Sequence, residues 1–532
     1  MAIVNTQNTE SPAQDTQEYI NIINNNPYRF NLGLFTSDGR YQQLKMGAIN
    51  SLVLVDKFTN FYHEGYIIIN NTFDAAERMV DFETQQNIAA NTTINTSSPK
   101  KGFIFKGDSR DLLVVDIMPV LTEDSDFNFN TTDKEAENYF KLSFTFSIYN
   151  TEEIPGSAPG EKFKKLYFWD MHYELLREKN SYFSTANYTD ADDVTNSDDS
   201  NRSIYTGEAI KSFLTEFFSE EDGWPVTIGD KFDQGATEIF FSAPAGFKGA
   251  DCLEYLMARH VSNSDNNYDQ AFLRAERNTS IFNLQSLRDI FKTALNTTAN
   301  STTPQVGSGY LETFKLGVYS DVNNEFTIEN IAFTPPDALF LDKYGTINNF
   351  NYDPMPGAYS QQDLVSVIVH NYNNDEKQFN VDQNQHSIQS TLCAYDANYV
   401  QLFNPVSFAG AYPNFFPGQY RMQQKNVKNI FTVVNDTTQR LSDGRNKAIF
   451  NNIFLNNTML FKVPGSTHRT AGSFIGVNRD NAFAFSDFDS KVLGIYLIIE
   501  VKHIFQGNEY FNEIRCIKTY SYDNLQLITG SR

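Results

Sequence analysis

Cysteine and basic residues are scarce in this sequence, and each shortage excludes a class of protein. The three cysteines, Cys252, Cys393 and Cys516, lie far apart. Such a sparse, odd set predicts neither a disulfide framework nor a thiolate zinc site, so we expect buried small hydrophobic side chains. The 42 Lys and Arg are outnumbered by 65 Asp and Glu, which gives a formal net charge of −23. This balance argues against basic nucleic-acid or membrane-surface binding, because both depend on Lys and Arg.

Long apolar runs and targeting segments are also missing. The longest runs, such as residues 493–501, are too short and too interrupted to span a bilayer. The first residues carry neither a basic nor an apolar segment, so we expect no signal peptide.

The sequence contains no recognisable catalytic motif: no Walker loop, no Gly-x-Ser-x-Gly and no His-Glu-x-x-His. The seven histidines are scattered without ligand spacing, and we interpret them as packed or surface side chains: His63, His172, His260, His370, His386, His468 and His503. The sequence therefore predicts no catalytic, cofactor-binding or metal-ligating residue, and no cofactor.

The acidic residues do not change this interpretation. Asp190, Asp192 and Asp193 have part of the spacing of a calcium loop, but the central Gly and the terminal bidentate Glu are missing. We therefore interpret residues 189–201 as a solvated loop. Pairs such as Glu152 and Glu153 say nothing about glycosidase chemistry in a chain with 65 carboxylates.

Aromatic residues are abundant, and they favour strands. Phe (46) and Tyr (28) provide nearly all of the 14% aromatic content. Strands are predicted in the first part at 48–55, 66–70, 103–105, 111–120 and 141–148. The last of these alternates strictly, with Leu142, Phe144, Phe146 and Ile148 on one face. This pattern is typical of a half-buried antiparallel strand.

The sequence predicts helices in the middle of the chain and strands again in its C-terminal part. Apolar residues at helical spacing predict helices from Thr206 (as the capping residue), from about Gly249 and from about Leu284, with a hairpin at 272–276 and 280–283. Later strands are predicted at 314–319, 326–331, 365–370, 458–463 and 473–477, with a helix at 444–457. The clearest hairpin joins 494–505 to 510–520 around Gly507-Asn508.

Four stretches carry a family resemblance through their order along the chain. They are INSLVLVDKF (49–58) with GYIII (65–69), FKGADCLEYL (247–256) with SIFNLQSL (280–287), GTINNFNYDP (345–354), and KVPGSTHRTAG (462–472) with GIYLIIEVKHIF (494–505). In this order the chain resembles the baseplate hub proteins of contractile-tailed bacteriophages, which are related to the hub part of type VI secretion spike proteins.

The resemblance implies a mainly β chain with an α+β middle: two tail-tube-like antiparallel β-barrel domains plus a helix-containing intermediate domain. The implied parts are an N-terminal arm (1–26), a first tube-like barrel with loop insertions (27–200), a helix-containing middle domain (201–310), the start of a second barrel (311–374), an irregular insertion (375–425) and the remainder of the second barrel (426–532). The arm is expected to be ordered by a partner or not at all.

The resemblance also implies a non-enzymatic homotrimer in the virion tail baseplate, assembled in the host cytoplasm. Three subunits with two barrels each would form a pseudo-six-fold ring that adapts a hexameric tail tube to a trimeric central spike. Expected partners are the spike protein, the tail tube protein or tube initiator, and baseplate wedge proteins. DNA or tape-measure protein would pass through the lumen without specific binding. A lysozyme domain and a β-helical spike would belong to another polypeptide.

Two alternatives remain at this level. The Asn, Tyr and Phe content also suits a receptor-binding tail fibre or adhesin, although fibre-like repeats are missing. A glycan-degrading tail enzyme of β-rich architecture would need a carboxylate pair in a groove.

Overall fold

The computed structural model describes a defined part of the chain. The described residues are 19–23, 26–35, 41–44, 48–71, 111–119, 140–187, 204–219, 224–235, 238–260, 262, 271–275, 280–286, 290, 311–315, 330–334, 347–353, 358–363, 372–373, 378–379, 428–433, 458–479 and 492–520.

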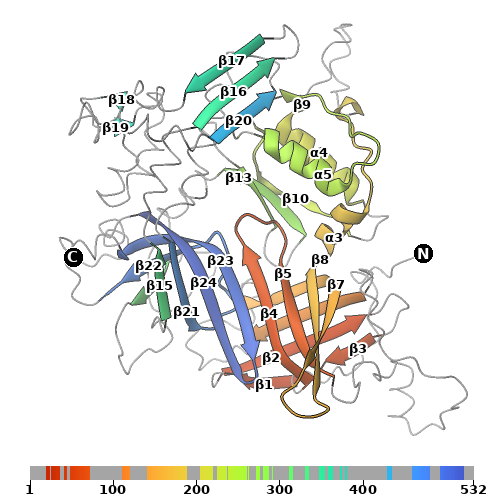
Figure 1. Cartoon of the computed structure of the whole chain (residues 1–532), viewed down its shortest axis with the longest axis vertical. Coiled ribbons are helices and arrows are strands. Elements are labelled where there is room, and N and C mark those ends of the chain that lie inside the picture. Colours follow the sequence, from red (N-terminus) through yellow and green to blue (C-terminus); the bar gives the residue numbers. More distant parts are fainter. Residues whose placement is uncertain are drawn as a thin grey trace, which may run out of the picture.

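Strands from both ends of the chain form one curled, 14-stranded sheet (Figure 1). The first set comprises β1 (Tyr19–Ile23), β2 (Asn26–Phe35), β3 (Tyr41–Leu44), β4 (Ile49–Lys57), β5 (Glu64–Asn70), β6 (Asp111–Pro119), β7 (Leu142–Pro155) and β8 (Lys162–Asp170). The second set comprises β14 (Glu312–Lys315), β15 (Asn330–Thr334), β21 (Thr458–Pro464), β22 (Phe474–Asn478), β23 (Gly494–Gln506) and β24 (Glu509–Tyr520). The order is β1-β2-β6-β7-β8-β5-β4-β23-β24-β21-β15, with β3 beside β2, β22 beside β23 and β14 beside β22.

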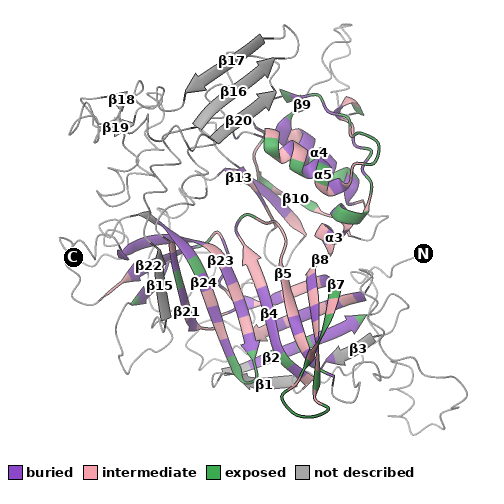
Figure 2. Ribbon diagram, in the orientation of Figure 1, coloured by how far each residue is buried: buried purple, intermediate pink, exposed green. Residues whose placement is uncertain are grey.

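The two strand sets meet where β4 pairs with β23. This antiparallel pairing runs from Lys57 opposite Glu500 to Ser51 opposite Gln506. The core continues across the seam, since Phe505 and Tyr510 belong to the same buried cluster as the first set. The Phe505 ring meets Phe30 edge-on at 5.4 Å between centroids. The N-terminal and C-terminal strands are therefore one packed unit, and Figure 2 shows buried residues on both sides of the seam.

A helix-containing middle unit follows the first strand set. It comprises α3 (Met171–Glu178), a 3-10 turn at Thr185–Asn187, β9 (Ile204–Tyr205), α4 (Thr206–Phe217), β10 (Thr227–Phe232), β11 (Glu238–Ile239), α5 (Gly249–Arg259), β12 (Ala271–Ala275) and β13 (Ile281–Ser286). Its strands form a sheet of order β10-β13-β12 and a β11-β9 pair. The helices pack on these strands around a second buried cluster that includes Phe213, Leu256 and Phe282.

Two smaller sheets complete the described strands. One has the order β17 (Ala358–Asp363), β16 (Ile347–Asp353) and β20 (Lys428–Val433), and the other pairs β18 (Tyr372–Asn373) with β19 (Gln378–Phe379). Among the described residues, no helix is long and apolar enough to cross a membrane.

The mainly β class with few helices, predicted from the sequence, is confirmed. Strands lie where they were expected at β4, β5, β6, β21 and β22, and the β23–β24 hairpin turns at Gly507. The alternating segment is the start of β7, which continues to Pro155. Its Phe146 is fully buried and lies 4.5 Å from the Phe168 ring, between centroids.

Several local predictions are wrong. The helix predicted from about Leu284 starts too early, since residues 284–286 belong to β13, which is held by β10 on one side and by β12 on the other; of the residues that follow in this prediction, the structure describes only Ile290, which is helical. Thr206 is the first residue of α4 rather than its cap, and its hydroxyl lies 3.0 Å from His260 Nδ1. Helix α3 was not predicted. Within the predicted N-terminal arm, Tyr19–Ile23 forms β1 and pairs with β2.

Some predicted elements lie outside the described residues. These are the strands at 103–105 and 365–370, the helix at 444–457, and most of the insertion at 375–425.

Candidate functional site

The described histidines and cysteines are packed side chains. Each histidine has a nearby polar group: Asp56 for His63, Asp170 for His172, Thr206 for His260, Ser466 for His468 and Tyr510 for His503. Cys252 and Cys516 are buried free thiols, and burial raises the pKa of both. His370, His386 and Cys393 lie outside the described residues.

Of the acidic residues considered in the sequence, the structure describes Glu152 and Glu153. Glu152 accepts a hydrogen bond from the Tyr167 hydroxyl at 2.9 Å, and its neighbour Glu153 is exposed on β7. Asp190, Asp192 and Asp193 lie outside the described residues. Within the described part of the chain, no group of three or more His, Cys, Asp or Glu side chains is placed to hold a metal ion.

Aromatic rings join the middle unit to the large sheet, beside a set of polar contacts described below. The turn between β4 and β5 projects aromatic rings into the middle unit. Phe58 lies 4.7 Å from Phe272 of β12, and Tyr62 stacks on Tyr173 of α3 at 3.8 Å, between ring centroids. These rings anchor the middle unit on the sheet through apolar contact.

A buried ion pair holds the loop between β21 and β22 against β14. The guanidinium of Arg469 donates to both carboxylate oxygens of Glu312, with Nε–Oε2 at 3.0 Å and Nη2–Oε1 at 2.7 Å. Both residues are buried, at 4% exposure each. Burial by itself would raise the pKa of Glu312, but the charges and hydrogen bonds of Arg469 and His468 outweigh it and lower this pKa to about 2.

Asn512 of β24 connects this ion pair to His503. Its Oδ1 accepts from the Ser466 amide and from Arg469 Nη1, both at 2.7 Å. Its Nδ2, which can only donate, lies 3.0 Å from His503 Nδ1. In this contact His503 Nδ1 is therefore the acceptor.

The backbone of one residue, Ala471, links the sheet, the loop and the middle unit. The Ala471 amide donates to Asp56 Oδ2 of β4 at 2.8 Å, and the Ala471 carbonyl accepts a hydrogen bond from Arg274 of β12. The next residue, Gly472, has a φ of 82°. A Cβ at Gly472 would overlap the Arg274 guanidinium, so the close approach requires glycine.

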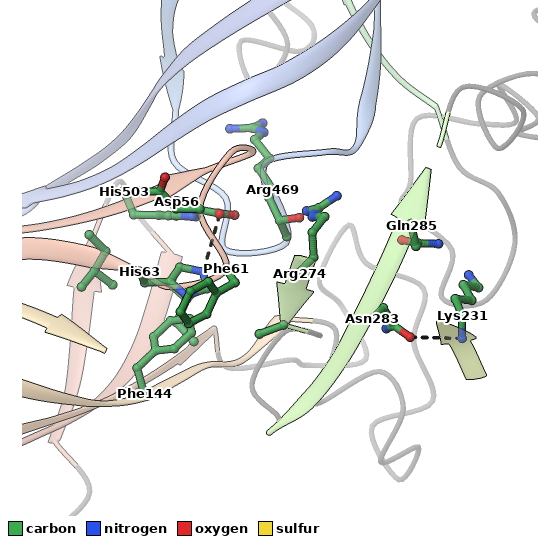
Figure 3. A pocket seen from close by; sticks show the side chains of 15 residues that line it. Asp56, Phe61, His63, Phe144, Lys231, Arg274, Asn283, Gln285, Arg469 and His503 are labelled. Atoms are coloured by element: carbon green, nitrogen blue, oxygen red, sulfur yellow. Dashed lines mark hydrogen bonds and ion pairs between the residues drawn. The ribbon is translucent and has the colours of Figure 1, made fainter. Parts of the chain in front are cut away.

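A cavity of about 250 Å³ lies beside this loop, which lines it with Arg469 and Thr470, between the sheet and the middle unit (Figure 3). Asp56, His63 and Phe144 line it from the sheet, and Lys231 and Arg274 line it from the middle unit. The sequence singled out neither Arg274 nor Glu312. These residues come together only through long-range pairing, since Glu312 and Arg469 are 157 positions apart.

No protein-family model matches the sequence, and no curated protein sequence matches it. Solved structures that resemble it include tail, baseplate and type VI secretion proteins. They include a tail protein from Neisseria meningitidis (8% identity, TM-score 0.43, covering 92% of this chain and 96% of that one). A 43 kDa tail protein of prophage MuSo2 from Shewanella oneidensis has 8% identity and a TM-score of 0.44, with 92% and 98% covered. In a Francisella PdpA–VgrG complex the values are 9% and 0.41, with 95% of this chain and 59% of that one covered. No residue role is carried over from these structures.

Proposed function

We propose that the chain is a structural baseplate hub protein of a contractile phage tail. In this proposal three copies form a pseudo-six-fold ring between the hexameric tail tube and the trimeric central spike, with a channel for genome passage. The protein acts without catalysis, in the tail baseplate of the virion. Its two tube-like barrels would correspond to residues 27–200 and to residues 311–374 with 426–532.

The observation that carries this proposal is the β4–β23 seam. A subunit that contributes two tube-like units to one ring must hold those units in a fixed relation. Here two strand sets, distant in sequence, share main-chain pairing from Lys57–Glu500 to Ser51–Gln506 and one buried cluster. Such a seam resists rotation of one set against the other, because movement would break hydrogen bonds and expose core side chains.

The open form of the sheet also supports assembly. Among the described strands, the path runs from β1 to β15 without returning to β1. Open sheet edges favour pairing with other chains unless they are covered. Neighbouring subunits of a ring would cover them, as would the proposed partners: the spike protein, the tail tube protein or tube initiator, and the wedge proteins.

The charge of the chain is compatible with a channel. With a formal net charge of −23, the protein repels phosphate and would let DNA or tape-measure protein pass without specific binding.

The mass of the native assembly tests the proposal. Native mass spectrometry or light scattering of the purified protein, alone and with its spike, should give multiples of three subunits. A stable monomer that never joins a tail would contradict it. Glycan or cell-surface binding by that monomer would favour a tail fibre or adhesin, and turnover of cell-wall or capsule polymer would favour an enzyme.

A further inference from the structure

The cavity between the sheet and the middle unit contains more positive than negative charge. Lys231, Arg274 and Arg469 line it, against the single carboxylate of Asp56. Arg469 is neutralised by Glu312, and Asp56 accepts a hydrogen bond from the Ala471 amide. That hydrogen bond leaves the negative charge of Asp56 in place, so Lys231 and Arg274 together give the lining a net excess of one positive charge, in a chain whose overall charge is strongly negative.

The protein, as far as the structure describes it, supplies hydrogen-bond acceptors for only part of the N–H donors of Arg274. Among the described residues its single hydrogen bond goes to the neutral carbonyl of Ala471, and its guanidinium lies 5.2 Å from the centroid of the Phe58 ring. No described carboxylate forms an ion pair with it, although the charge of Asp56, beyond ion-pair distance, acts on the guanidinium and offsets part of the effect of burial. A guanidinium has five N–H donors, and a desolvated charge is costly unless it is paired. Burial accordingly lowers the pKa of Arg274.

Lys231 adds a second charge on the same side of the cavity. It lies on β10, where its main-chain amide is held by Asn283 Oδ1 at 3.2 Å, and its residue is exposed. Within the described part of the chain its ammonium group forms no ion pair. Figure 3 shows Lys231 and Arg274 on different strands of the middle unit, with His63 and Phe144 across from them.

We propose that this cavity binds a compact oxyanion, held by Arg274 and by Lys231 at its solvent-exposed side. Arginine binds carboxylate and phosphate oxygens through paired N–H groups, and lysine contributes a point charge. The volume of about 250 Å³ lies below the range of drug-sized ligand sites, so it favours a small ion over a nucleotide. Inorganic phosphate and a short dicarboxylate share the required chemistry. A bound anion would strengthen the attachment of the middle unit to the sheet, because Arg274 also donates to the Ala471 carbonyl.

Isothermal titration and thermal unfolding of the full chain test the proposal, with sodium phosphate and sodium succinate as probes and sodium chloride at matched ionic strength as the reference. We expect at least one probe to bind with a millimolar dissociation constant and to raise the unfolding midpoint above the chloride reference. Binding by phosphate alone or succinate alone would assign the ligand class. Binding by neither would overturn the proposal.

Variants locate the binding. Arg274→Gln should weaken it at least about tenfold, as expected for the loss of charged hydrogen bonds, and Lys231→Met should weaken it severalfold. The matched control is Lys211→Gln, which removes an exposed lysine of α4 that lies 3.8 Å from Glu208 and is not among the lining residues. It should leave binding unchanged. Unchanged affinity in Arg274→Gln would overturn the proposal. If that variant does not fold, unchanged affinity in Lys231→Met would do so, since Lys231 is exposed and its loss should not impair folding.

Discussion

Replacing Glu312 by Gln should destabilise the protein through the charge that it leaves behind. Arg469 would remain buried without its carboxylate partner, although it would keep its hydrogen bonds to the Pro464 carbonyl and to Asn512. Removing one partner of a buried ion pair typically costs about 3–5 kcal/mol. The free energy of unfolding, from urea titration followed by circular dichroism, should fall by about that amount.

The pKa of Glu312 gives a second, independent value for the stability that its ionised carboxylate contributes. A carboxyl whose pKa is 4.5 in the unfolded chain and about 2 in the folded protein contributes about 3 kcal/mol above the unfolded value, at about 1.36 kcal/mol per pKa unit. Because the folded pKa is the lower one, this stability is present above pH 4.5 and is lost as the pH falls toward 2. The Glu312→Gln variant should lack this contribution to acid sensitivity.

A double variant and an exposed control separate the ion pair from general effects. Glu312→Gln combined with Arg469→Gln should cost about 0.5–3 kcal/mol less than the sum of the single changes, since the pair is in direct contact. Lys211→Gln, which breaks only an exposed contact, should change stability by less than about 0.5 kcal/mol. A loss below about 1 kcal/mol for Glu312→Gln would refute the reasoning. So would a variant whose free energy of unfolding falls between pH 4.5 and 2 as steeply as that of the unchanged protein.

Three further predictions concern burial and backbone geometry. Phe146→Ala should lose about 3–5 kcal/mol of unfolding free energy, measured by urea titration, because its ring is fully buried; a loss below about 1 kcal/mol would contradict the described packing. In a Cys393→Ser background, Cys252 and Cys516 should react with Ellman's reagent only on unfolding, since burial raises the pKa of both thiols; rapid reaction in the native protein would contradict it. Gly472→Ala should lower the unfolding midpoint more than Gly160→Ala, because both have positive φ but only Gly472 lies against Arg274; equal effects would refute the role of this close approach.

Local patterns in the sequence predicted the strands well. The alternation around Phe146 places this side chain in the core, and the Gly507-Asn508 turn predicts the β23–β24 hairpin, where Gly507 has a φ of 58°. These signals are local, because strand alternation and turn conformation depend on neighbouring residues.

Two elements, β13 and α3, differ from what their local sequence predicts. The apolar spacing from Leu284 predicts a helix, but pairing of 281–286 with strands on both sides keeps residues 284–286 in a strand, while Ile290 is helical. For α3 a signal was present: Asp170 accepts a hydrogen bond from the His172 amide at 2.8 Å as an N-cap. The helix spans only Met171–Glu178, too short for its apolar spacing to stand out.

The polar junction could not have been predicted from one sequence. Asp56 and Ala471 are 415 positions apart, and Arg274 reaches Ala471 across 197 positions. Neither separation leaves a local pattern. The same holds for the β4–β23 seam, which depends on long-range strand pairing.

The central proposal is that each subunit holds two β units joined at the β4–β23 seam, so that three subunits form a ring of six similar β units. An electron-microscopy image of the purified assembly tests it most directly. The proposal predicts a hollow ring with three-fold symmetry and six similar β units around the opening. Isolated monomers, or particles without a central opening or three-fold symmetry, would contradict it.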